Sequence, residues 1–454
     1  MYAIDLFCGA GGCSEGLIQA GFDIVFSSDI SDMVELTYRN RHEQLGLHQG
    51  YNTWFERSDI RDLTGKLIWQ RIKALEWFHN GERKAPKDID LMIGGPSCQG
   101  FSRAGKRDIH DPRNMLFGEY VRVIHEVKPK YIVLENVEGF MDMQFVGYKG
   151  LDIKNKNNNV IEYGPIYPDG SVTPDILRSE LKRIGYQTLE PRILNAADFG
   201  VPQRRNRVIF IGYRNGEKVP SYPKPTVKEN QYVSLADAVG DLIVSPTLRR
   251  KVNPRLSEYQ LASRAGRTPA TDGKPIPLTG EETCTVLPNV SDIVTERFSL
   301  FIQGESGANL RKRVKNEGIN LKHCKVLVAY CSKLLGMDSE RVISLFMSGE
   351  ATDEQIDILL TKKNVRQRWA SDQPAATVVS IPDDYISPWE PRTFSVREMA
   401  RFQSFDDSFE FLGKRTTGGL LRRVEVPQYT QVGNAVPPLL ARAVAESIAA
   451  VLKD

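Results

Sequence analysis

Residues 2–16 read YAIDLFCGAGGCSEG, and their pattern is the first indication of the fold class. A short apolar run of strand length ends in a glycine-rich turn and continues into a helical pattern that reaches Gly21. FDIVFSSD at 22–29 has the composition of a second strand, and SDMVELTYRNRH at 31–42 that of a second helix. Strands that alternate with helices predict a parallel sheet covered by helices on both faces.

The same alternation continues through the first half of the chain. Three further apolar runs have the length of strands: DIDLMIGG at 88–95, YIVLENV at 131–137 and RVIFIGY at 207–213. Between the first two lies NMLFGEYVRVIHEV at 114–127, whose apolar residues recur at helical spacing. We expect an α/β fold in which residues 1–213, together with residues 428–454, form a Rossmann-like domain with a doubly wound, mostly parallel sheet.

After Tyr213 the chain becomes irregular, rich in Pro, Gly and polar residues, with one clearly helical stretch near residues 322–336. This change predicts a second, irregular domain over residues 214–427, which includes a helical segment at 392–405 that supports it. Strong helical patterning returns in QVGNAVPPLLARAVAESIAAVL at 431–452. We expect this last segment to be a closing helix that docks back on the first domain.

The bulk composition suits an intracellular protein with more than one domain. The chain has 454 residues, of which 41% are hydrophobic and 26% charged, enough to bury a sizeable core. No apolar run reaches the roughly 18 residues of a membrane span, and the N-terminus does not resemble a secretory signal. We therefore expect a cytoplasmic protein without a membrane partner. The net charge of +3 permits nucleic-acid binding without establishing it.

The cysteines argue against a metal site and against a disulfide framework. Six are present, and none of them form a CxxC pair. Cys324 and Cys331 lie in the pattern KHCKVLVAYCSKLLG at 322–336, which is typical of a helix. We therefore expect buried thiols at these positions rather than metal ligands, and no metal cofactor.

The glycine-rich turn has the features of a site for a nucleotide-like ligand. Gly9 and Gly11 lack side chains that would block a ligand from the backbone and from the following helix N-terminus. Asp29 ends the next strand about 20 residues on, a position suited to ribose hydroxyls. Ser14 stands where the third glycine of a GxGxxG motif would be. Domains for NAD, FAD and S-adenosylmethionine all use such a turn, and a purely structural turn is a further alternative.

Cys98 has the surroundings of a nucleophile. It lies in GGPSCQGFS at 94–102, at the carboxyl end of a predicted strand, where open α/β sheets bind ligands. Structural cysteines are mostly buried within strands or helices, whereas this one lies in a turn that contains glycine and proline. A helix N-terminus or a nearby arginine would lower the pKa of the thiol and populate the thiolate. The alternative is a small residue that fills a turn.

Four polar residues adjoin two other predicted strands. Glu135 comes at the end of an apolar run, where a carboxylate serves either a helix start or a binding site. Gln203, Arg205 and Arg207 alternate in QRRNRV, so strand periodicity places them on one face. Such a face suits an anionic or polar ligand, although the solvated basic residues of an edge strand would give the same pattern.

Six motifs occur along the chain in the order DLFCGAGG, PSCQGFS, ENV, QRRNRV, RTFSVREMARFQSF and GNAVPP. Together they resemble the ordered motifs of the cytosine-C5 DNA methyltransferases. The resemblance covers residues 1–213 and 373–454 and omits most of the region between them. Its one departure is Ser97, because the family commonly has proline immediately before the catalytic cysteine.

The resemblance implies a reaction through a covalent intermediate. Cys98 would attack C6 of a cytosine flipped out of the duplex, so that C5 becomes nucleophilic and takes a methyl group. Glu135 would contact N3 and the exocyclic amine, while Arg205 and Arg207 would bind the O2 side of the base. Extrusion of the base costs roughly a few kcal/mol, which these contacts must offset.

The resemblance also implies S-adenosylmethionine as the methyl donor, which leaves as S-adenosylhomocysteine. Phe7 would add a cation–π contact to the sulfonium, Asp29 would bind the ribose, and Asp59 would bind the adenine amine. The full set of implied donor contacts is Phe7, Gly9, Gly11, Asp29, Ile30, Asp59, Ile60, Pro96, Leu116, Asn434 and Val436.

Contacts to DNA are expected from a loop and from the second domain. The loop SRAGKRDIHDPRN at 102–114 is polar and basic, and we expect it to close over DNA. Its candidate DNA contacts are Ser102, Arg103, Lys106 and Arg107. Gln203 is a further candidate from outside this loop. The domain at 214–427 would recognise the target, and its clusters RRK at 249–251 and RKRVK at 311–315 suit phosphates. A solvated surface is the alternative for each charge run.

The expected partner is double-stranded DNA, bound by a monomer that is associated with the nucleoid. The resemblance also allows a cognate restriction endonuclease or a defence-system protein as a partner. Three alternatives stay open, namely a tRNA cytosine-C5 methyltransferase, a catalytically silent DNA-binding protein on the same fold, and an NAD-dependent oxidoreductase. The long recognition region argues against the first. Cys98, Glu135 and Arg207 argue against the second, and PSCQGFS against the third.

Overall fold

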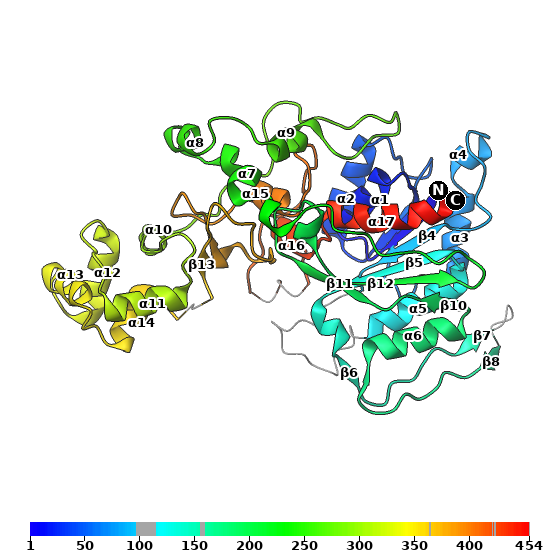
Figure 1. Cartoon of the computed structure of the whole chain (residues 1–454), viewed down its shortest axis with the longest axis horizontal. Helices are drawn as coiled ribbons and strands as arrows, with labels where there is room; N and C mark the ends of the chain where they lie inside the picture. Colours follow the sequence, from blue (N-terminus) through cyan, green and yellow to red (C-terminus); the bar gives the residue numbers. More distant parts are fainter. Residues whose placement is uncertain (97–114, 155–158, 363–364, 420, 422–423, 454) are drawn as a thin grey trace.

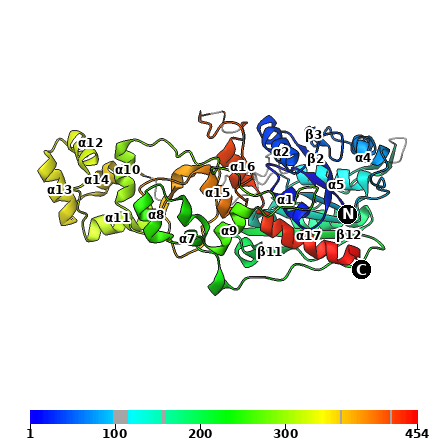
Figure 2. The same cartoon turned by 90° about the horizontal axis from the view of Figure 1, so that it is seen from above.

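The computed structural model describes residues 1–96, 115–154, 159–362, 365–419, 421 and 424–453. These residues form an elongated molecule with a β-sheet domain at one end and a cluster of helices at the other (Figure 1). A middle part joins the two ends, built around α7 (Leu235–Val239), α15 (Val396–Phe402) and α16 (Gln428–Asn434), as Figure 2 shows from above.

An eight-stranded sheet forms the centre of the first domain. Along the sheet the strands are β10 (Tyr186–Thr188), β12 (Asn206–Arg214), β5 (Tyr131–Asn136), β4 (Leu91–Gly94), β1 (Tyr2–Leu6), β2 (Asp23–Asp29) and β3 (Phe55–Arg57), with β11 (Arg192–Asn195) beside β12. Neighbouring strands from β3 to β5 run parallel, whereas β12 runs antiparallel to β5, β10 and β11. The predicted doubly wound, mostly parallel sheet is confirmed, with an antiparallel edge.

Helices cover both faces of this sheet. One face carries α1 (Gly12–Gln19) and α17 (Pro438–Lys453), and the other carries α3 (Gly65–Lys73), α5 (Leu116–Val127) and α6 (Thr173–Arg183). Along β5, Val133 belongs to the core under α1 and α17, whereas its neighbours Ile132 and Leu134 belong to the core under α3, α5 and α6. This alternation is the one that a β-strand requires. The domain is completed by α2 (Asp32–Gln44), α4 (Glu76–His79) and two ribbons, β6 (Gln144–Phe145) with β9 (Ser171–Val172) and β7 (Ile153–Lys154) with β8 (Val160–Glu162).

Two glycines let α17 approach α1 closely. A Cβ at Gly16 would lie 2.4 Å from the amide nitrogen of Arg442, and one at Gly12 would lie 2.1 Å from the carbonyl oxygen of Val436. The two glycines are four residues apart, so they share the helix face that meets α17 and the residues just before it. The prediction that a closing helix docks back on the first domain is confirmed, and the glycines explain how it fits.

Gly16→Ala is expected to destabilise the protein. In a helix interior this change ordinarily stabilises by roughly 0.5–1 kcal/mol. Here the new methyl group meets the backbone of α17, and overpacking of this kind costs about 1–3 kcal/mol. The midpoint of urea unfolding should therefore fall. A midpoint at or above that of the wild type would mean that the two helices are less tightly packed than the structure has them.

The segment Gln428–Lys453 is long and apolar enough to cross a membrane by length and composition alone. Over half of its most apolar window is buried inside the protein. Val444, Ala445 and Ile448 of α17 belong to the core between this helix and the sheet. Because a helix packed against a sheet must be equally apolar, this segment is only a weak indication of a membrane.

The middle part has an aromatic core of its own. Besides α7, α15 and α16 it contains α8 (Pro246–Val252), α9 (Glu258–Ala265) and the ribbon of β13 (Gln367–Arg368) with β14 (Tyr385–Ile386). Trp369 packs against Phe394 and Phe402 with ring centroids 5.0 and 5.6 Å apart. Ser395 caps α15 in a capping box with Glu398. The predicted helical segment at 392–405 therefore lies at the centre of this core.

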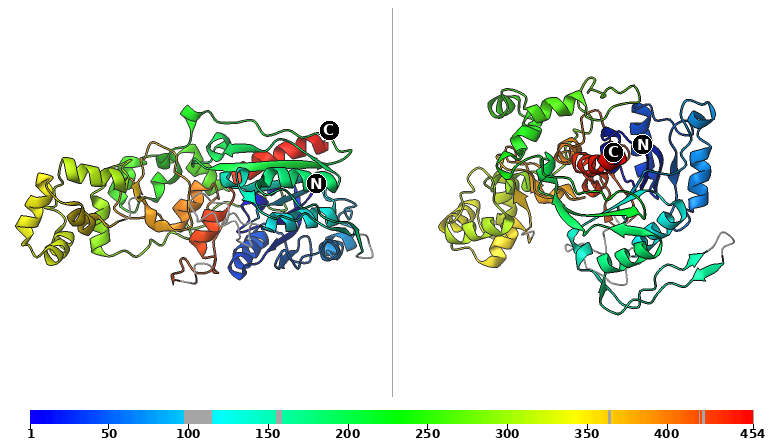
Figure 3. Two further views of the ribbon diagram at one scale, coloured as in Figure 1. Left: turned by 90° about the horizontal axis from the view of Figure 1, so that it is seen from below. Right: turned by 45° about the vertical axis from the view of Figure 1, so that its right-hand side comes forward.

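Five helices form the far end of the molecule, where they project away from the sheet domain (Figure 3). They are α10 (Asp292–Ser299), α11 (Gly307–Asn316), α12 (Lys325–Leu335), α13 (Ser339–Ser348) and α14 (Asp353–Leu360). The prediction of an irregular region with one helical stretch is wrong here. Helices this short are marginal alone and depend on packing, so their sequence periodicity is weak. Cys324 and Cys331 are buried in this helical module, as predicted.

An ion-pair network fixes α15 within the middle core. The fully buried guanidinium of Arg401 donates to both carboxylate oxygens of Asp407 and of Asp241. It also donates to the carbonyl oxygen of Ala238, in α7, at 3.0 Å. A single side chain therefore ties three segments together.

Arg401→Met is expected to lower the free energy of unfolding by about 3–5 kcal/mol, because Asp407 is left with the more distant Arg397, at 3.9 Å, and Asp241 with Arg264, at 2.8 Å. Urea unfolding of the variant measures this loss. Arg442→Met is the matched control, since Arg442 pairs with Glu446 on the surface of α17 with both side chains about half exposed. Its loss should be about 1 kcal/mol or less. Equal losses in the two variants would refute the structural role of Arg401.

Candidate functional site

The order of the strands reverses between β1 and β4. From β1 the chain proceeds to β2 on one side, whereas β4 lies on the other side of β1. Open α/β sheets bind ligands outside the carboxyl ends of the strands at such a switch point. The glycine-rich turn leaves β1 here, and Gly95 and Pro96 leave β4. The site is therefore built at this edge of the sheet.

The turn after β1 offers its backbone to a ligand. Phe7, Gly9 and Gly11 have φ values of 55°, 52° and 99°, and a Cβ at Gly9 would meet nothing within 4 Å. Asp29 accepts hydrogen bonds from the amide of Gly9 at 3.1 Å and from that of Ser31 at 3.0 Å. Burial raises the pKa of the Asp29 carboxyl, although these amides oppose the shift. The turn is thus held from the end of β2 while its outer side stays open.

A buried hydrogen-bonded chain supports this turn, and sequence reasoning missed it. A Cβ at Gly11 would come within 3.2 Å of the ring of Tyr38, in α2. The Tyr38 hydroxyl bonds to Ser14 at 2.7 Å and to Ser27 at 2.5 Å, and Ser14 donates to Asp5 at 2.7 Å. Burial raises the pKa of Asp5 to about 7. Tyr38 occupies an ordinary helical position, so no sequence signal marks it.

Three of the residues predicted to bind the methyl donor lie at the ends of neighbouring strands. Ile30 directly follows β2 and is 65% exposed, which leaves an apolar side chain available to a ligand. Asp59 pairs with Arg61 at 2.5 Å, and the hydrogen bonds of this pair lower the pKa of Asp59. Ile60 is buried, and its carbonyl oxygen accepts a hydrogen bond from Arg122 at 2.7 Å. This loop is therefore anchored to α5.

The other residues predicted to bind the methyl donor come from separate helices and loops. The carbonyl oxygen of Pro96 accepts a hydrogen bond from the Asn136 side chain at 3.0 Å. Leu116 is partly buried at the start of α5, and Asn434 is exposed at the end of α16. Val436 follows, with its carbonyl oxygen against α1. The structure thus brings segments from both ends of the chain to the switch point.

Glu135 and Arg207 form an ion pair beside this point. Nε of Arg207 lies 2.8 Å from Oε1 of Glu135, with the two side chains 11% and 12% exposed. The antiparallel pairing of β12 with β5 brings them together. Burial raises the pKa of Glu135, although the guanidinium groups of Arg207 and Arg205 oppose the shift. A Cβ at Gly95 would lie 3.1 Å from Oε2 of Glu135, so the loop that leads to Cys98 starts beside this carboxylate.

Gln203 and Arg205 are buried and make hydrogen bonds within the protein. Gln203 is fully buried, so the predicted DNA contact is wrong, because an enclosed amide cannot reach a phosphate. Its amide bonds to Phe402, Gln403 and Val378. Arg205 is 2% exposed, and its guanidinium donates to the carbonyl oxygens of Val378, Gly433 and Ala435. Main-chain contacts therefore hold the guanidinium of Arg205, and its base contact stays a prediction.

Several predicted residues lie outside the described residues: Cys98, Ser97, Ser102, Arg103, Lys106 and Arg107. The described chain stops at Pro96 and resumes at Met115. Pro96 and Leu116, which are predicted to bind the methyl donor, lie at these two ends. The roles of the nucleophile and of the basic loop therefore stay predictions.

The two basic clusters of the second domain differ in their partners. Arg311, Arg313 and Lys315 pair with Asp357, Glu305 and Asp353. Carboxylates thus pair with three of the four cations at 311–315 and leave the exposed Lys312, which weakens the case for the predicted phosphate contacts. Arg249, Arg250 and Lys251 of α8 are exposed, and within the described part of the chain none of the three forms an ion pair. That cluster keeps the charge that a phosphate contact requires.

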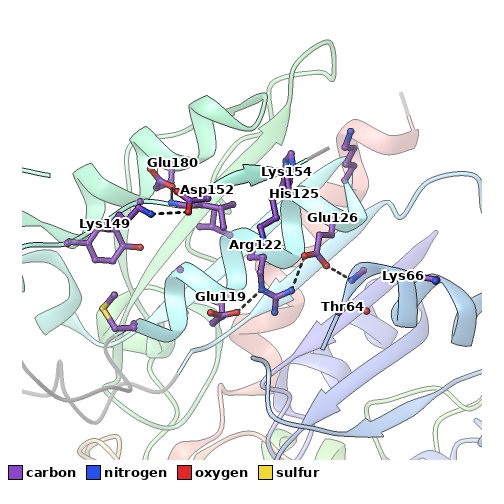
Figure 4. Close-up of a pocket in the computed structure, with 18 of the residues that line it drawn as sticks. Thr64, Lys66, Glu119, Arg122, His125, Glu126, Lys149, Asp152, Lys154 and Glu180 are labelled. Carbon is purple, nitrogen blue, oxygen red and sulfur yellow. Dashed lines mark hydrogen bonds and ion pairs between the residues drawn. The ribbon is translucent and has the colours of Figure 1, made fainter. Parts of the chain in front are cut away.

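A groove of about 960 Å³ runs along the outer side of α5, between α3 and residues 148–154 (Figure 4). Arg122 lies in its wall and pairs with Glu119 at 2.7 Å and with Glu126 at 3.0 Å. None of the residues predicted to bind the methyl donor or the flipped base lines this groove. We therefore place the site at the strand ends rather than in this groove.

Comparison with known proteins agrees with this geometry. The family model described as C-5 cytosine-specific DNA methylase matches residues 1–450. The chain belongs to this family. It is 31% identical over 456 residues to the type II methyltransferase M.DdeI of Desulfomicrobium norvegicum, covering 99% of this chain and 88% of that one. It is also 31% identical to the type II methyltransferase M.XorII of Xanthomonas oryzae pv. oryzae, with coverage of 99% and 85%.

The methyltransferase therefore acts on C5 of cytosine in DNA, and its type II relatives indicate a sequence-specific enzyme of the restriction–modification kind. A solved structure from E. coli, described as a prophage-encoded DNA modification methyltransferase, shares its fold with a TM-score of 0.61 at 20% identity, over the full length of both chains. The family match excludes the oxidoreductase alternative and favours DNA over tRNA as the substrate.

Proposed function

We propose that the methyltransferase holds a flipped cytosine against Glu135 and Arg207, attacks it with Cys98 and methylates it from S-adenosylmethionine. The observation that carries the proposal is the nearly buried Glu135–Arg207 pair, beside the strand end that leads to Cys98. A carboxylate that accepts and a guanidinium that donates complement the polar edge of cytosine, which presents an amine, N3 and O2.

The proposed chemistry starts at C6 of the base. Addition of the Cys98 thiolate forms an S–C6 bond and moves the electron pair of the C5=C6 bond onto C5. Glu135 accepts from the exocyclic amine and favours a proton on N3, while Arg207 donates to O2. Once C5 carries the methyl group, water takes the C5 proton. The electron pair of the C5–H bond re-forms the C5=C6 bond, and the pair of the S–C6 bond leaves with the Cys98 thiolate. The raised pKa of Glu135 supports its place next to a shared proton.

The switch point fits a sulfonium nucleotide. S-adenosylmethionine, when bound, supplies an electrophilic methyl group. The open space above Gly9 supports close approach of its methionine part to the backbone. Phe7 offers an aromatic ring to the sulfonium, Asp29 a carboxylate to the ribose, and the exposed Ile30 an apolar contact to the adenine. Contacts from the remaining strand ends complete the donor site: Gly11, Asp59, Ile60, Pro96, Leu116, Asn434 and Val436.

The division of labour along the chain is part of the proposal. Residues 1–213 and 428–454 form the catalytic domain, although α16 also packs into the middle core, and residues 214–427 recognise the target. The exposed cations of α8 and the loop at 102–114 contact DNA phosphates. The enzyme acts as a monomer on nucleoid DNA in the cytoplasm, with a cognate restriction endonuclease or a defence-system protein as its partner.

Bisulfite sequencing of plasmid from cells that express the protein tests this function. We expect bisulfite-resistant cytosines at one short sequence and at no other. Resistant cytosines in tRNA, with none in plasmid, would favour the RNA alternative. A plasmid without resistant cytosines, from cells that contain the folded protein, would overturn the proposal.

A further inference from the structure

The last carbonyl groups of α16 are bonded by side chains from two other parts of the chain. The final four carbonyls of an α-helix lack partners within the helix and must find them elsewhere. Nε2 of Gln403 donates to the carbonyl oxygen of Val432 at 2.7 Å and to that of Ala435 at 3.2 Å. Nη2 of Arg205 donates to Gly433 at 2.9 Å and to Ala435 at 3.2 Å.

Gln203 joins these two side chains into one cluster. Its Nε2 lies 2.8 Å from Oε1 of Gln403, and its Oε1 lies 3.5 Å from Nη1 of Arg205. The three side chains are 0%, 0% and 2% exposed, in the order Gln203, Gln403 and Arg205. Because a buried polar group must be satisfied within the protein, the geometry of this cluster is strongly determined.

The cluster lies between the two halves of the proposed site. Asn434 contacts the methyl donor in the proposed function. It lies between Gly433 and Ala435, whose carbonyl groups accept these hydrogen bonds. On the other side, Arg205 is two residues from Arg207, which pairs with Glu135. The cluster therefore adjoins both the segment around Asn434, which is proposed to bind the methyl donor, and β12, which carries Arg207.

The turn from 432 to 436 is confined on two further sides. A Cβ at Gly433 would lie 2.6 Å from the amide nitrogen of Ser380. One at Gly12 would lie 2.1 Å from the carbonyl oxygen of Val436. Packing thus limits where the turn can move, and the hydrogen bonds of Gln403 and Arg205 select one position within that space.

We propose that Gln403 and Arg205 are positioning residues that fix the turn at 432–436 against the donor. The proposal rests on the proposed function, because it takes Asn434 and Val436 as donor contacts. Gln403 lies in the segment 392–405, which the sequence predicts only as a support for the second domain. It touches neither base nor donor, so its effect passes through the turn.

Gln403→Met tests the proposal, because methionine keeps the length and volume of the side chain but cannot donate to the two carbonyls. The variant loses the two hydrogen bonds to the turn and the one that Gln403 accepts from Gln203. We expect the Kd for S-adenosylmethionine, measured by calorimetry without DNA, to rise about tenfold as a result. The KM for the donor should rise with it, while kcat at saturating donor and the Kd for duplex DNA change by less than about threefold.

Gln428→Met is the matched control at the other end of α16. Nε2 of Gln428 also donates to two carbonyl oxygens, those of Phe411 and Gly413, at 2.8 and 3.2 Å. This variant makes the same substitution away from the turn, at a glutamine that is only partly buried. Its Kd for S-adenosylmethionine should therefore stay within about twofold of wild type. Gln403→Asn, one methylene shorter but still an amide, should show a smaller rise than Gln403→Met and decides the matter if Gln403→Met does not fold.

A folded Gln403 variant with unchanged donor affinity would overturn the proposal, and so would a defect in DNA binding alone. Equal losses of donor affinity in Gln403→Met and Gln428→Met would also overturn it, because they would reflect general destabilisation. Failure of the proposed function gives a different result, since the wild-type protein itself would then not bind S-adenosylmethionine.

Discussion

Cys98→Ala should abolish methylation of duplex DNA while S-adenosylmethionine binding stays within about twofold of wild type. Without the thiolate, C5 of cytosine lacks the electron density to accept a methyl group, because no S–C6 bond forms. Donor binding should persist, since the proposed donor contacts come from other residues. Transfer of a labelled methyl group to plasmid measures the first effect, and calorimetry measures the second.

Two comparisons make this result specific to Cys98. Cys284→Ala removes a partly buried thiol in the middle core and should leave methylation intact. DNA that carries 5-fluorocytosine at the target has no C5 proton to lose, so the S–C6 bond should persist after methyl transfer. Wild type should then form a complex that survives denaturing electrophoresis, and Cys98→Ala should not. Methylation by the alanine variant would rule out the covalent mechanism.

Glu135→Gln should lower kcat by about 10²- to 10³-fold, the effect of removing one preorganised group that stabilises the transition state. The amide keeps the shape of the side chain but no longer pairs as an anion with Arg207, whose Nε lies 2.8 Å away. It also cannot favour a proton on N3 of the base. Single-turnover methylation at saturating donor measures the chemical step directly.

Glu138→Gln is the matched control for this variant. Glu138 accepts a hydrogen bond from Asn206 at 2.9 Å, three residues beyond Glu135 and outside the proposed pocket. It should keep kcat within about threefold of wild type. If Glu135→Gln were equally active, the ion pair would be structural and the pocket for the base would have to lie elsewhere.

Much of the first domain could be predicted from the sequence. Apolar runs of strand length alternate with helical spacing there, and each element buries its own periodic face, so local pattern and final fold agree. The helix at 114–127 is an example, because α5 (Leu116–Val127) buries Tyr120, Val123 and Val127 on one face. The family resemblance then assigned functional roles to the residues at the strand ends.

The helical module could not be predicted in the same way. Its helices are 8 to 11 residues long, and most of their stability comes from packing against one another. Local signals were nevertheless present, because Asp338 caps α13, and Thr352 with Gln355 forms a capping box at α14. Cap residues would have revealed these helices better than apolar periodicity did.

The amino-acid sequence alone predicts that Cys98 lies in a turn at the end of a strand, and it places Glu135 and Arg207 beside two further strands. Which of the aligned polar residues meet depends on how the chain packs in three dimensions. Arg207 reaches Glu135, whereas Gln203 and Arg205, in the same alternating pattern, are buried against α15 and the end of α16. The physical reason is that strand periodicity assigns a side chain to a face, but what covers that face comes from segments some two hundred residues away along the chain.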